Sequence, residues 1–291
     1  MSKEIDLSIV IVNYNTYDDV ISCLQSIYKN SKSVNLEVIV IDNASQDGSQ
    51  KAIRKNFPQV KLISNRTNLF FSKANNQGLK IAKGRYLLIL APDTKILPNT
   101  LLKMINFMDA HPTCALSTIK QIDQNHAVHL TCHKHHTPIT EILKMPLWHK
   151  FFIDSLILKS FRYANWNRNS LKCTDTVPGA FMWVRREIAQ KLEFLDGNFD
   201  IFYSDADFCK RISDLGWEII YNGNYSIIHL RARSISKIAP FKLMQIAHHD
   251  LNHYAKKHFG QIWSTIIYIL GNINIGILNI VFTFKKLIPV K

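Results

Sequence analysis

Three acidic residues stand at places in the sequence where a carboxylate could act on a substrate. Asp42 follows the apolar run LEVIVI, Asp93 follows YLLIL in the stretch LAPDT, and Asp205 lies in the segment FYSDADFCK. A carboxylate can bind a ribose or a base, hold Mg²⁺ or Mn²⁺ beside a diphosphate, or accept a proton as a general base. Each position also suits an ordinary turn or helix-cap acid, so the residues alone leave both interpretations open.

The setting of Asp205 favours chemistry over capping. Phe199, Phe202 and Tyr203 precede Asp205 and Asp207 at the expected start of a helix. Acids in the first turn are favoured by the helix dipole, which is the ordinary explanation. An apolar setting, however, raises the pKa of a carboxyl group toward the range of a general base. A general base is therefore expected in this segment.

The elements that position these acids alternate between strand and helix over the first 120 residues. Apolar, β-branched runs predict strands at 7–13, 36–41, 60–63, 86–90 and 114–119. Helical spacing predicts helices at 18–28, 49–57, 72–82 and 99–110. This alternation predicts an α/β fold with a doubly wound, mostly parallel sheet and flanking helices.

Ligands of such sheets bind outside the carboxyl ends of the strands. Asn13–Asn15, Asp42–Ser45 and Asp93 all follow predicted strands. We therefore expect these three polar groups to converge on one crevice, where the ring of Tyr14 could stack on a nucleotide base.

The pattern changes after residue 120. Residues 121–138 are polar and rich in histidine, and residues 144–169 mix aromatic and basic side chains. Regular elements are predicted again as strand-like residues 176–185, a helix at 205–215, strands at 217–221 and 225–229, and a helix at 241–258.

The combined motifs resemble the family 2 glycosyltransferases of the GT-A fold, and within them the rhamnosyltransferase-like branch. The matching pieces are SIVIVNYNT (8–16), VIVIDNASQDGS (38–49), KANNQGLKIAKGRYLLILAPDT (73–94), VPGAFMWVRR (177–186), FYSDADFCKRISDLGW (202–217) and HLRARS (229–234). Their order makes the resemblance specific, and it covers about residues 6–260.

The resemblance implies an inverting hexosyl transfer from a nucleoside diphosphate sugar, with dTDP-rhamnose as the leading donor. It implies Asp205 as the catalytic base that deprotonates the acceptor hydroxyl. It implies that Asp93 and His229 hold a divalent cation, Mg²⁺ or Mn²⁺, on the diphosphate. The donor-binding residues that it implies are Tyr14, Asn15, Asp42, Asn76, Asp93, Gly179 and Ala180. The implied acceptor is a lipid-linked or growing cell-surface polysaccharide.

Three positions depart from the branch pattern. The branch usually has Asn where this chain has Ala91, Gly where it has Phe70, and Glu where it has Ser204. Phe70 is expected to narrow the donor pocket. Ser204 removes an acidic neighbour that could raise the pKa of Asp205. These departures bear on the donor sugar and leave the reaction class in place.

The segment 126–136 gathers a second set of possible metal ligands. It contains His126, His129, Cys132, His133, His135 and His136. The spacing matches no standard structural zinc site, so we interpret this segment as a solvated loop near the acceptor. The five cysteines are odd in number and widely spaced, which indicates free thiols in a reducing cytosol.

The C-terminal part combines positive charge with apolar runs. The chain has a net charge of +14, and after residue 230 Lys and Arg far outnumber the single acid, Asp250. Trp263–Phe284 carries no charged residue, but its asparagines favour a helix in the plane of a membrane over a spanning one; a buried core helix remains open. Such a pattern favours a lipid surface over nucleic acid.

These observations give a domain plan. Residues 1–235 are expected to form the GT-A catalytic domain, with a nucleotide-binding half at about 1–120 and an acceptor half at about 121–235. Residues 236–291 are expected to form a C-terminal helical, membrane-associating region. The protein is expected to be peripheral on the cytoplasmic face of the cell membrane, and an oligomer is possible. The alternatives are a catalytically inactive nucleotide-sugar-binding or scaffold protein, or a nucleotidyltransferase on a related fold.

Overall fold

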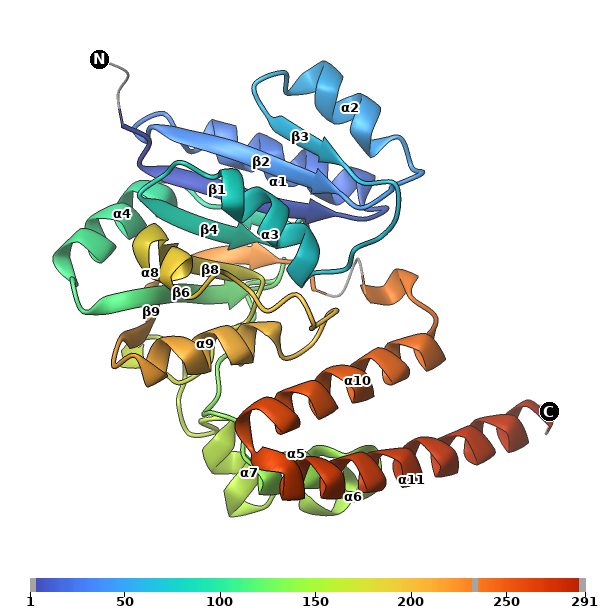
Figure 1. Cartoon of the computed structure of the whole chain (residues 1–291). Helices are drawn as coiled ribbons and strands as arrows, with labels where there is room; N and C mark the ends of the chain where they lie inside the picture. The colour runs from blue at the N-terminus through green and yellow to red at the C-terminus, as the bar shows by residue number, and fades with distance from the viewer. Residues whose placement is uncertain (1–3, 232–234, 288–291) are drawn as a thin grey trace.

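A mixed β-sheet with helices on both faces forms the centre of the molecule. The computed structural model describes residues 4–231 and 235–287 (Figure 1). The strands are β1 (Leu7–Asn13), β2 (Leu36–Asp42), β3 (Lys61–Ser64), β4 (Tyr86–Leu90), β5 (Thr94–Ile96), β6 (Cys114–Ile122), β7 (Leu171–Cys173), β8 (Phe181–Arg185) and β9 (Glu218–His229).

Helices connect these strands and continue beyond them. They are α1 (Tyr17–Lys29), α2 (Ser49–Asn56), α3 (Ser72–Ile81), α4 (Thr100–Ala110), α5 (Pro138–Lys144), α6 (Pro146–Phe152), α7 (Leu156–Phe161), α8 (Arg186–Lys191), α9 (Ser204–Asp214), α10 (Pro240–His258) and α11 (Gly260–Leu287), with a 3₁₀ turn at Ile235–Lys237. The predicted α/β class and the flanking helices are confirmed.

Within the described residues the strand order is β3-β2-β1-β4-β8-β6-β9-β5, and β7 pairs with β9. The first four strands are parallel, as the strand–helix alternation predicts. β8 then inserts antiparallel between β4 and β6, so β6 does not pair with β4. The alternation could not predict this insertion, because β8 comes from much later in the chain.

Two details of the predicted strands are wrong. The two strands expected at 217–221 and 225–229 are one strand, β9, whose pairing with β6 shifts register between Ile119 and Lys120. The short strand β5 was not predicted. It pairs antiparallel with the end of β9, with Thr94 opposite His229.

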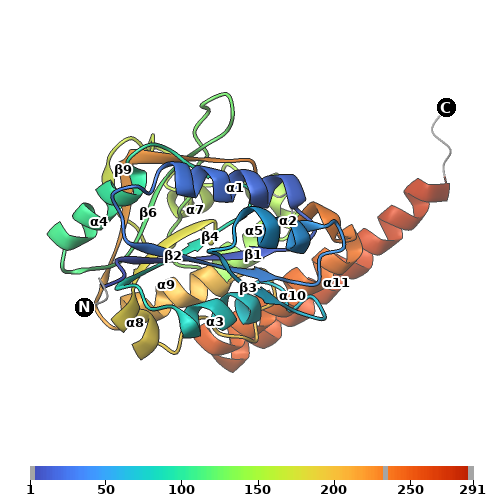
Figure 2. The ribbon, with the colours of Figure 1, turned by 90° about the horizontal axis from the view of Figure 1, so that it is seen from above.

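Alternating side chains of the sheet serve two separate cores. Ile9 and Ile11 of β1 pack with Leu24 of α1 and with α4 on one face. Val10, between them, packs with α3, α8 and α9 on the other face. Figure 2 shows these two helical layers on either side of the sheet. The period of two along a strand therefore explains why the strands are apolar throughout.

The C-terminal helices α10 and α11 form a hairpin beside α5 (Figure 1). Gly260 lies between them with φ +79°, a backbone conformation that glycine adopts without steric cost. Leu251 and Ala255 of α10 pack with Ile267 of α11 and Met145. Among the described residues, none of the helices has both the length and the apolar character that crossing a membrane requires.

A buried ionic cluster attaches α10 to α9, one of the helices that cover the sheet. Asp207 of α9 is fully buried. Its Oδ2 accepts a hydrogen bond from Arg211 at 2.8 Å, and its Oδ1 lies 2.7 Å from Lys257 Nζ and 2.8 Å from His258 Nε2. Burial alone would raise the pKa of Asp207, but the hydrogen bond from His258 and the charges of Arg211 and Lys257 hold this pKa below its ordinary value.

We predict that Asp207→Asn lowers the free energy of unfolding by about 3–5 kcal/mol at neutral pH, because the partly buried cations around it would lose a fully buried carboxylate partner. The stability that Asp207 contributes is present above the ordinary carboxyl pKa of about 4 and is lost as the pH falls through its lowered pKa in the folded state. Urea unfolding at pH 7 and below pH 4 should therefore show a gap between variant and wild type that shrinks in acid.

The matched control is Asp214→Asn on the same helix. Asp214 is half exposed and pairs only with Lys210 across one helical turn. Such a surface pair contributes little, so the control should unfold within about 0.5 kcal/mol of the wild type. Equal effects of the two substitutions would contradict the role given to Asp207.

Candidate functional site

A cleft of about 360 Å³ opens at the carboxyl ends of β1 and β4. Its walls come from the β1–α1 turn, the turn after β4, the residues before α3, the turn before β8, the residues before α9 and the end of β9. Of the sequence-predicted site residues, those on its lining are Tyr14, Asp93, Gly179, Ala180, Asp205 and His229. The crevice expected at this edge of the sheet is therefore present.

Asp93 and His229 meet at one side of the cleft. The pairing of β5 with β9 brings them together, and Nε2 of His229 lies 3.3 Å from Oδ1 of Asp93. Nδ1 of His229 lies 2.8 Å from Oε1 of Gln121. An amide oxygen can only accept, so Nδ1 carries a proton, and Nε2, which faces the carboxylate, is the ring nitrogen available to a cation. This pair has the chemistry of a divalent-cation site.

Asp205 lies at the start of α9 on the wall of the cleft. Its Oδ2 accepts a hydrogen bond from the backbone N–H of Gly179 at 2.9 Å, and its Oδ1 accepts one from the N–H of Ala206 at 2.9 Å. Burial raises the pKa of the Asp205 carboxyl, and these two N–H groups lower it only in part. A carboxylate with a raised pKa is suited to accept a proton.

Asp42 and Asn15 hold the turns behind the cleft and do not line it. Asp42 is fully buried, and its carboxylate accepts hydrogen bonds from Asn13, Gln50 and the backbone N–H of Ser45 at 2.8–2.9 Å. Oδ1 of Asn15 accepts from the N–H of Gln46 at 2.8 Å. Both residues therefore form hydrogen bonds that hold the end of β1 and the end of β2 together.

The cleft wall carries Asn75 and not Asn76. Asn76 exchanges two hydrogen bonds with the backbone of Leu195, at 2.7 and 3.1 Å, and so attaches α3 to the segment after α8. Successive residues on a helix point about 100° apart, so only one of the two asparagines can face the cleft. Oδ1 of Asn75 is buried without a hydrogen-bond partner, which leaves it available to a ligand. The adjacent pair in KANNQG gave no signal to choose between them.

Phe70 and Ser204, two of the departures from the family pattern, both have local consequences. Phe70 lines the cleft with φ +58°, the left-handed region that favours glycine. Its carbonyl accepts a hydrogen bond from Asn43 at 2.8 Å, which holds this backbone in place. Ser204 does not cap α9; its hydroxyl meets that of Ser72 at 2.8 Å in a buried contact, and Tyr203 occupies the cap position with φ +60°.

The histidine-rich segment is only partly solvated, which corrects the expectation of a solvated loop. The rings of His133 and Phe161 stack with centroids 4.7 Å apart, and burial lowers the pKa of His133 to about 3. His136 is largely buried, and its Nδ1 lies 2.5 Å from Oε1 of Glu141. Aromatic side chains of α7 and of the segment before α9 cover these two rings, a contact between distant residues that the local composition does not reveal.

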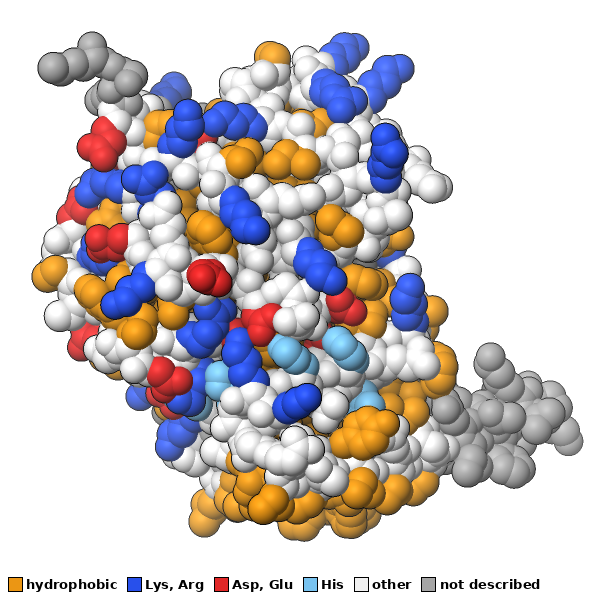
Figure 3. All heavy atoms as spheres, in the orientation of Figure 1, with side chains coloured by type: hydrophobic (Ala, Val, Ile, Leu, Met, Phe, Trp, Pro, Cys, Tyr) orange, Lys and Arg blue, Asp and Glu red, His pale blue; other side chains and the backbone are white. Residues whose placement is uncertain are grey.

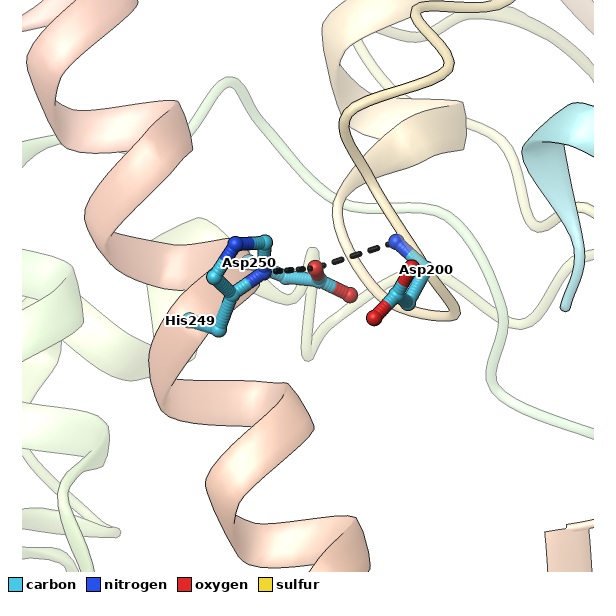
Figure 4. A group of neighbouring side chains, drawn as sticks. All are labelled: Asp200, His249 and Asp250. Atoms are coloured by element: carbon cyan, nitrogen blue, oxygen red, sulfur yellow. Dashed lines mark hydrogen bonds and ion pairs between the residues drawn. The ribbon is translucent and has the colours of Figure 1, made fainter. Parts of the chain in front are cut away.

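A separate group of possible ligands lies at the edge of α10. Figure 4 shows Asp200, His249 and Asp250, whose ligand-type atoms lie within 4.8 Å of one another. Both oxygens of Asp250 already accept backbone hydrogen bonds, from Asp200 at 3.1 Å and from Ile201 and Phe202 at 2.9 and 2.8 Å. Asp250 therefore anchors the backbone that leads to Asp205.

Solved structures superpose on most of this chain. The mannosyltransferase PcManGT from Pyrobaculum calidifontis, solved in complex with GDP-Man and Mn²⁺, superposes with a TM-score of 0.58 at 16% identity, over 94% of this chain and 74% of that one. Residues 1–349 of TarS from S. aureus give a TM-score of 0.53 at 16% identity, over 87% of this chain and 72% of that one. These likenesses show a GT-A fold.

Curated relatives match over shorter stretches. The chain is 32% identical over 101 residues to the uncharacterized glycosyltransferase YibD of Escherichia coli (strain K12), which covers 34% of this chain and 29% of that protein. It is 30% identical over 111 residues to the succinoglycan biosynthesis protein ExoO of Rhizobium meliloti (strain 1021), over 38% of this chain and 32% of that protein. The matches thus span about a third of each relative.

The family is shown by a longer match. The model of glycosyl transferase family 2 matches residues 8–192, which is more than half of the chain and includes the turns that carry Tyr14, Asp93 and Gly179. Together with the GT-A neighbours, this match means that the chain belongs to glycosyltransferase family 2.

Proposed function

We propose that this glycosyltransferase transfers a sugar from a nucleoside diphosphate to a hydroxyl group with inversion, and that Asp205 is its general base. The main support for this proposal is that two kinds of site lie in one cleft. The Asp93–His229 pair suits a cation on a diphosphate, and Asp205 suits a proton acceptor. A donor bound between them would expose its anomeric carbon to an acceptor on the Asp205 side.

The proposed step moves one proton and exchanges one bond. Asp205 takes the proton of the acceptor hydroxyl as its oxygen attacks the anomeric carbon, and the bond from that carbon to the diphosphate oxygen breaks. The backbone N–H groups of Gly179 and Ala206 hold the carboxylate in one orientation for this attack. Attack from the side opposite the leaving group accounts for inversion.

Asp93 and His229 would hold the divalent cation, Mg²⁺ or Mn²⁺. The fit rests on the lone pair of His229 Nε2, which the Gln121 contact leaves beside the Asp93 carboxylate. When bound there, a cation would neutralise the charge of the departing diphosphate. The Mn²⁺ with which PcManGT was solved supports this choice of metal.

As the donor we propose a pyrimidine nucleotide sugar, with dTDP-rhamnose as the leading candidate. Tyr14 offers a ring to the base, and Asn75 offers an unpaired carbonyl oxygen. Phe70 occupies cleft volume that a glycine would leave open, which favours a compact sugar.

On the acceptor side we propose a lipid-linked or growing cell-surface glycan, reached from the cytoplasmic face of the membrane. The name of ExoO refers to succinoglycan biosynthesis, and that of a further relative, GgaB of Bacillus subtilis (strain 168), to minor teichoic acid biosynthesis. GgaB is 29% identical over 110 residues, 36% of this chain and 12% of that protein. The positive charge of the C-terminal region would favour an anionic membrane surface.

We predict that Asp205→Asn lowers the transfer rate about 10²- to 10⁴-fold, because the amide cannot accept the acceptor proton. Donor binding should survive, since the substitution keeps the size of the side chain. Radiolabelled transfer and a thermal-shift screen of nucleotide sugars measure the two properties separately. In the wild type, transfer should fall as the pH drops through the raised pKa of Asp205.

Asp214→Asn, outside the cleft and at the far end of the same helix, is the control for this experiment. Transfer at the wild-type rate by Asp205→Asn would refute the base assignment. If the protein binds nucleotide sugars but transfers none under any condition, the alternative of an inactive binding protein stands instead.

We predict that Asp93→Asn weakens Mn²⁺ binding at least tenfold, because the cation would lose its carboxylate ligand. Electron paramagnetic resonance of free Mn²⁺ measures this without any assay of transfer. Asp200→Asn, in the other group of possible ligands, is the control and should leave Mn²⁺ affinity unchanged. The reverse result would move the cation to the group formed by Asp200, His249 and Asp250.

A further inference from the structure

A second pocket, of about 240 Å³, lies between α5, α10 and α11, outside the cleft described above. Most of its lining is apolar and includes Met145 and Pro146 beyond α5, Met244 and Leu251 from α10, and Ile275 from α11. The glycosyl transfer proposed above does not use it. Figure 1 shows the three helices that enclose it near the lower end of the molecule.

Two polar side chains line this pocket without satisfying each other. Asn274 is 3% exposed, and neither its Nδ2 nor its Oδ1 has a hydrogen-bond partner. Nε2 of His248 is also buried and unpartnered. A buried polar group without a hydrogen-bond partner destabilises the folded state, so helix packing alone does not explain an asparagine at position 274. A ligand that carries a hydrogen-bonding group would remove this cost.

Packing fixes His248 in this position. Its ring lies on Gly271 of α11, where an added Cβ would come within 2.3 Å of the ring, and it stacks on Tyr268 with centroids 5.5 Å apart. Gly271 therefore leaves the space that the imidazole fills. His248 and Asn274 thus give a mostly apolar pocket one polar end. Such a pocket suits an amphiphile better than a sugar or a nucleotide.

An exposed apolar face lies on the same end of the molecule. It comprises side chains of α6, α7 and α11, namely Trp148, Phe151, Phe152, Leu156, Ile157, Ile262, Trp263, Ile269, Ile273 and Ile277. Figure 3 shows hydrophobic side chains gathered along this lower end. Exposure of these apolar side chains to water is unfavourable, whereas their contact with a lipid surface is favourable. A lipid could therefore pass from the bilayer into the pocket without crossing water.

Tyr203 connects the second pocket to the cleft. It lines both, and its hydroxyl donates a hydrogen bond to Oε2 of Glu141 at 2.5 Å. Glu141 and Lys144, 2.6 Å apart, lie on the wall of the second pocket. Tyr203 is two residues from Asp205, so a ligand that occupied the pocket would end close to the proposed base.

We propose that this pocket binds the lipid portion of a membrane-borne acceptor, an apolar chain joined to a polar or phosphate group, and so presents its sugar hydroxyl to Asp205. Asn274 and His248 would form hydrogen bonds with the polar or phosphate group. The acceptor role rests on the function proposed above; amphiphile binding does not. The shape and lining of the pocket do not distinguish an isoprenoid from an acyl chain, and the test separates these sources.

Farnesyl phosphate is the probe, and its binding to the whole protein is measured by isothermal titration calorimetry without donor. Ala247→Trp fills the pocket and should raise the dissociation constant at least tenfold. Asn274→Leu should weaken binding severalfold while leaving the melting temperature unchanged or higher, because it removes an unpaired amide. Asn272→Leu, on the exposed side of the same helix, is the matched control and should bind as the wild type does.

Inorganic phosphate and oleate complete the binding test. Inorganic phosphate alone should not bind, because most of the contact is apolar. Wild-type affinity for farnesyl phosphate in both Ala247→Trp and Asn274→Leu would overturn the pocket assignment. Oleate that binds at least as tightly and excludes farnesyl phosphate would make this a site for a bilayer lipid, which also overturns the acceptor role.

Kinetics separate this inference from the proposed function. With a membrane extract as acceptor, farnesyl phosphate should raise the KM for acceptor and leave the KM for donor unchanged. Binding without that rise would overturn the acceptor role of the pocket. Failure of the Asp205→Asn experiment would instead remove the proposed base, and the affinity of the pocket for the probe would not change.

Discussion

The pairing of β5 with β9 is the constraint on which the candidate cation site depends. β5 has only three residues, yet it sets Thr94 opposite His229, and the N–H of Leu230 donates to the carbonyl of Asp93 at 2.9 Å. Backbone hydrogen bonds therefore bring the Asp93 and His229 side chains together. Because Asp93 directly precedes β5 and His229 is the last residue of β9, the strand pairing sets their geometry before any ligand binds.

A second constraint joins the C-terminal helices to the segment that carries the proposed base, Asp205. The buried carboxylate of Asp250 accepts hydrogen bonds from the backbone N–H groups of Asp200, Ile201 and Phe202. These three residues lie outside the strands and helices. This contact fixes the backbone before Tyr203, whose positive φ directs the chain into α9 and places Asp205 in the cleft. The C-terminal hairpin is thus part of the framework of the candidate site and not only an attachment. A movement of α10 would be transmitted to the proposed base through the carboxylate of Asp250.

The sequence predicts the parallel half of the fold and the neighbourhood of the site, because both follow from local patterns. Apolar runs such as LSIVIVN and strand-end polar residues require only the neighbouring chain to be interpreted. The insertion of β8 and the brief strand β5 depend on pairing between residues at least 66 positions apart, which periodicity does not contain. For the same reason the choice between Asn75 and Asn76, and the burial of His133 by Phe161, appear only in three dimensions.

Asp205 and Asp207 lie in the same helical turn but differ in role: Asp207 stabilises the folded state, and Asp205 is the proposed base. The pKa of Asp207 is lowered because Arg211, Lys257 and His258 surround its carboxylate. The pKa of Asp205 is raised because burial outweighs the backbone N–H groups and the nearby His136. Ionised Asp205 therefore weakens the folded state above the ordinary carboxyl pKa, whereas ionised Asp207 strengthens it. A base that kept the cations of Asp207 would be stable but too weak to take a proton. The first turn of α9 therefore holds one carboxylate that attaches α10 to the rest of the molecule and another whose raised pKa suits a proton acceptor.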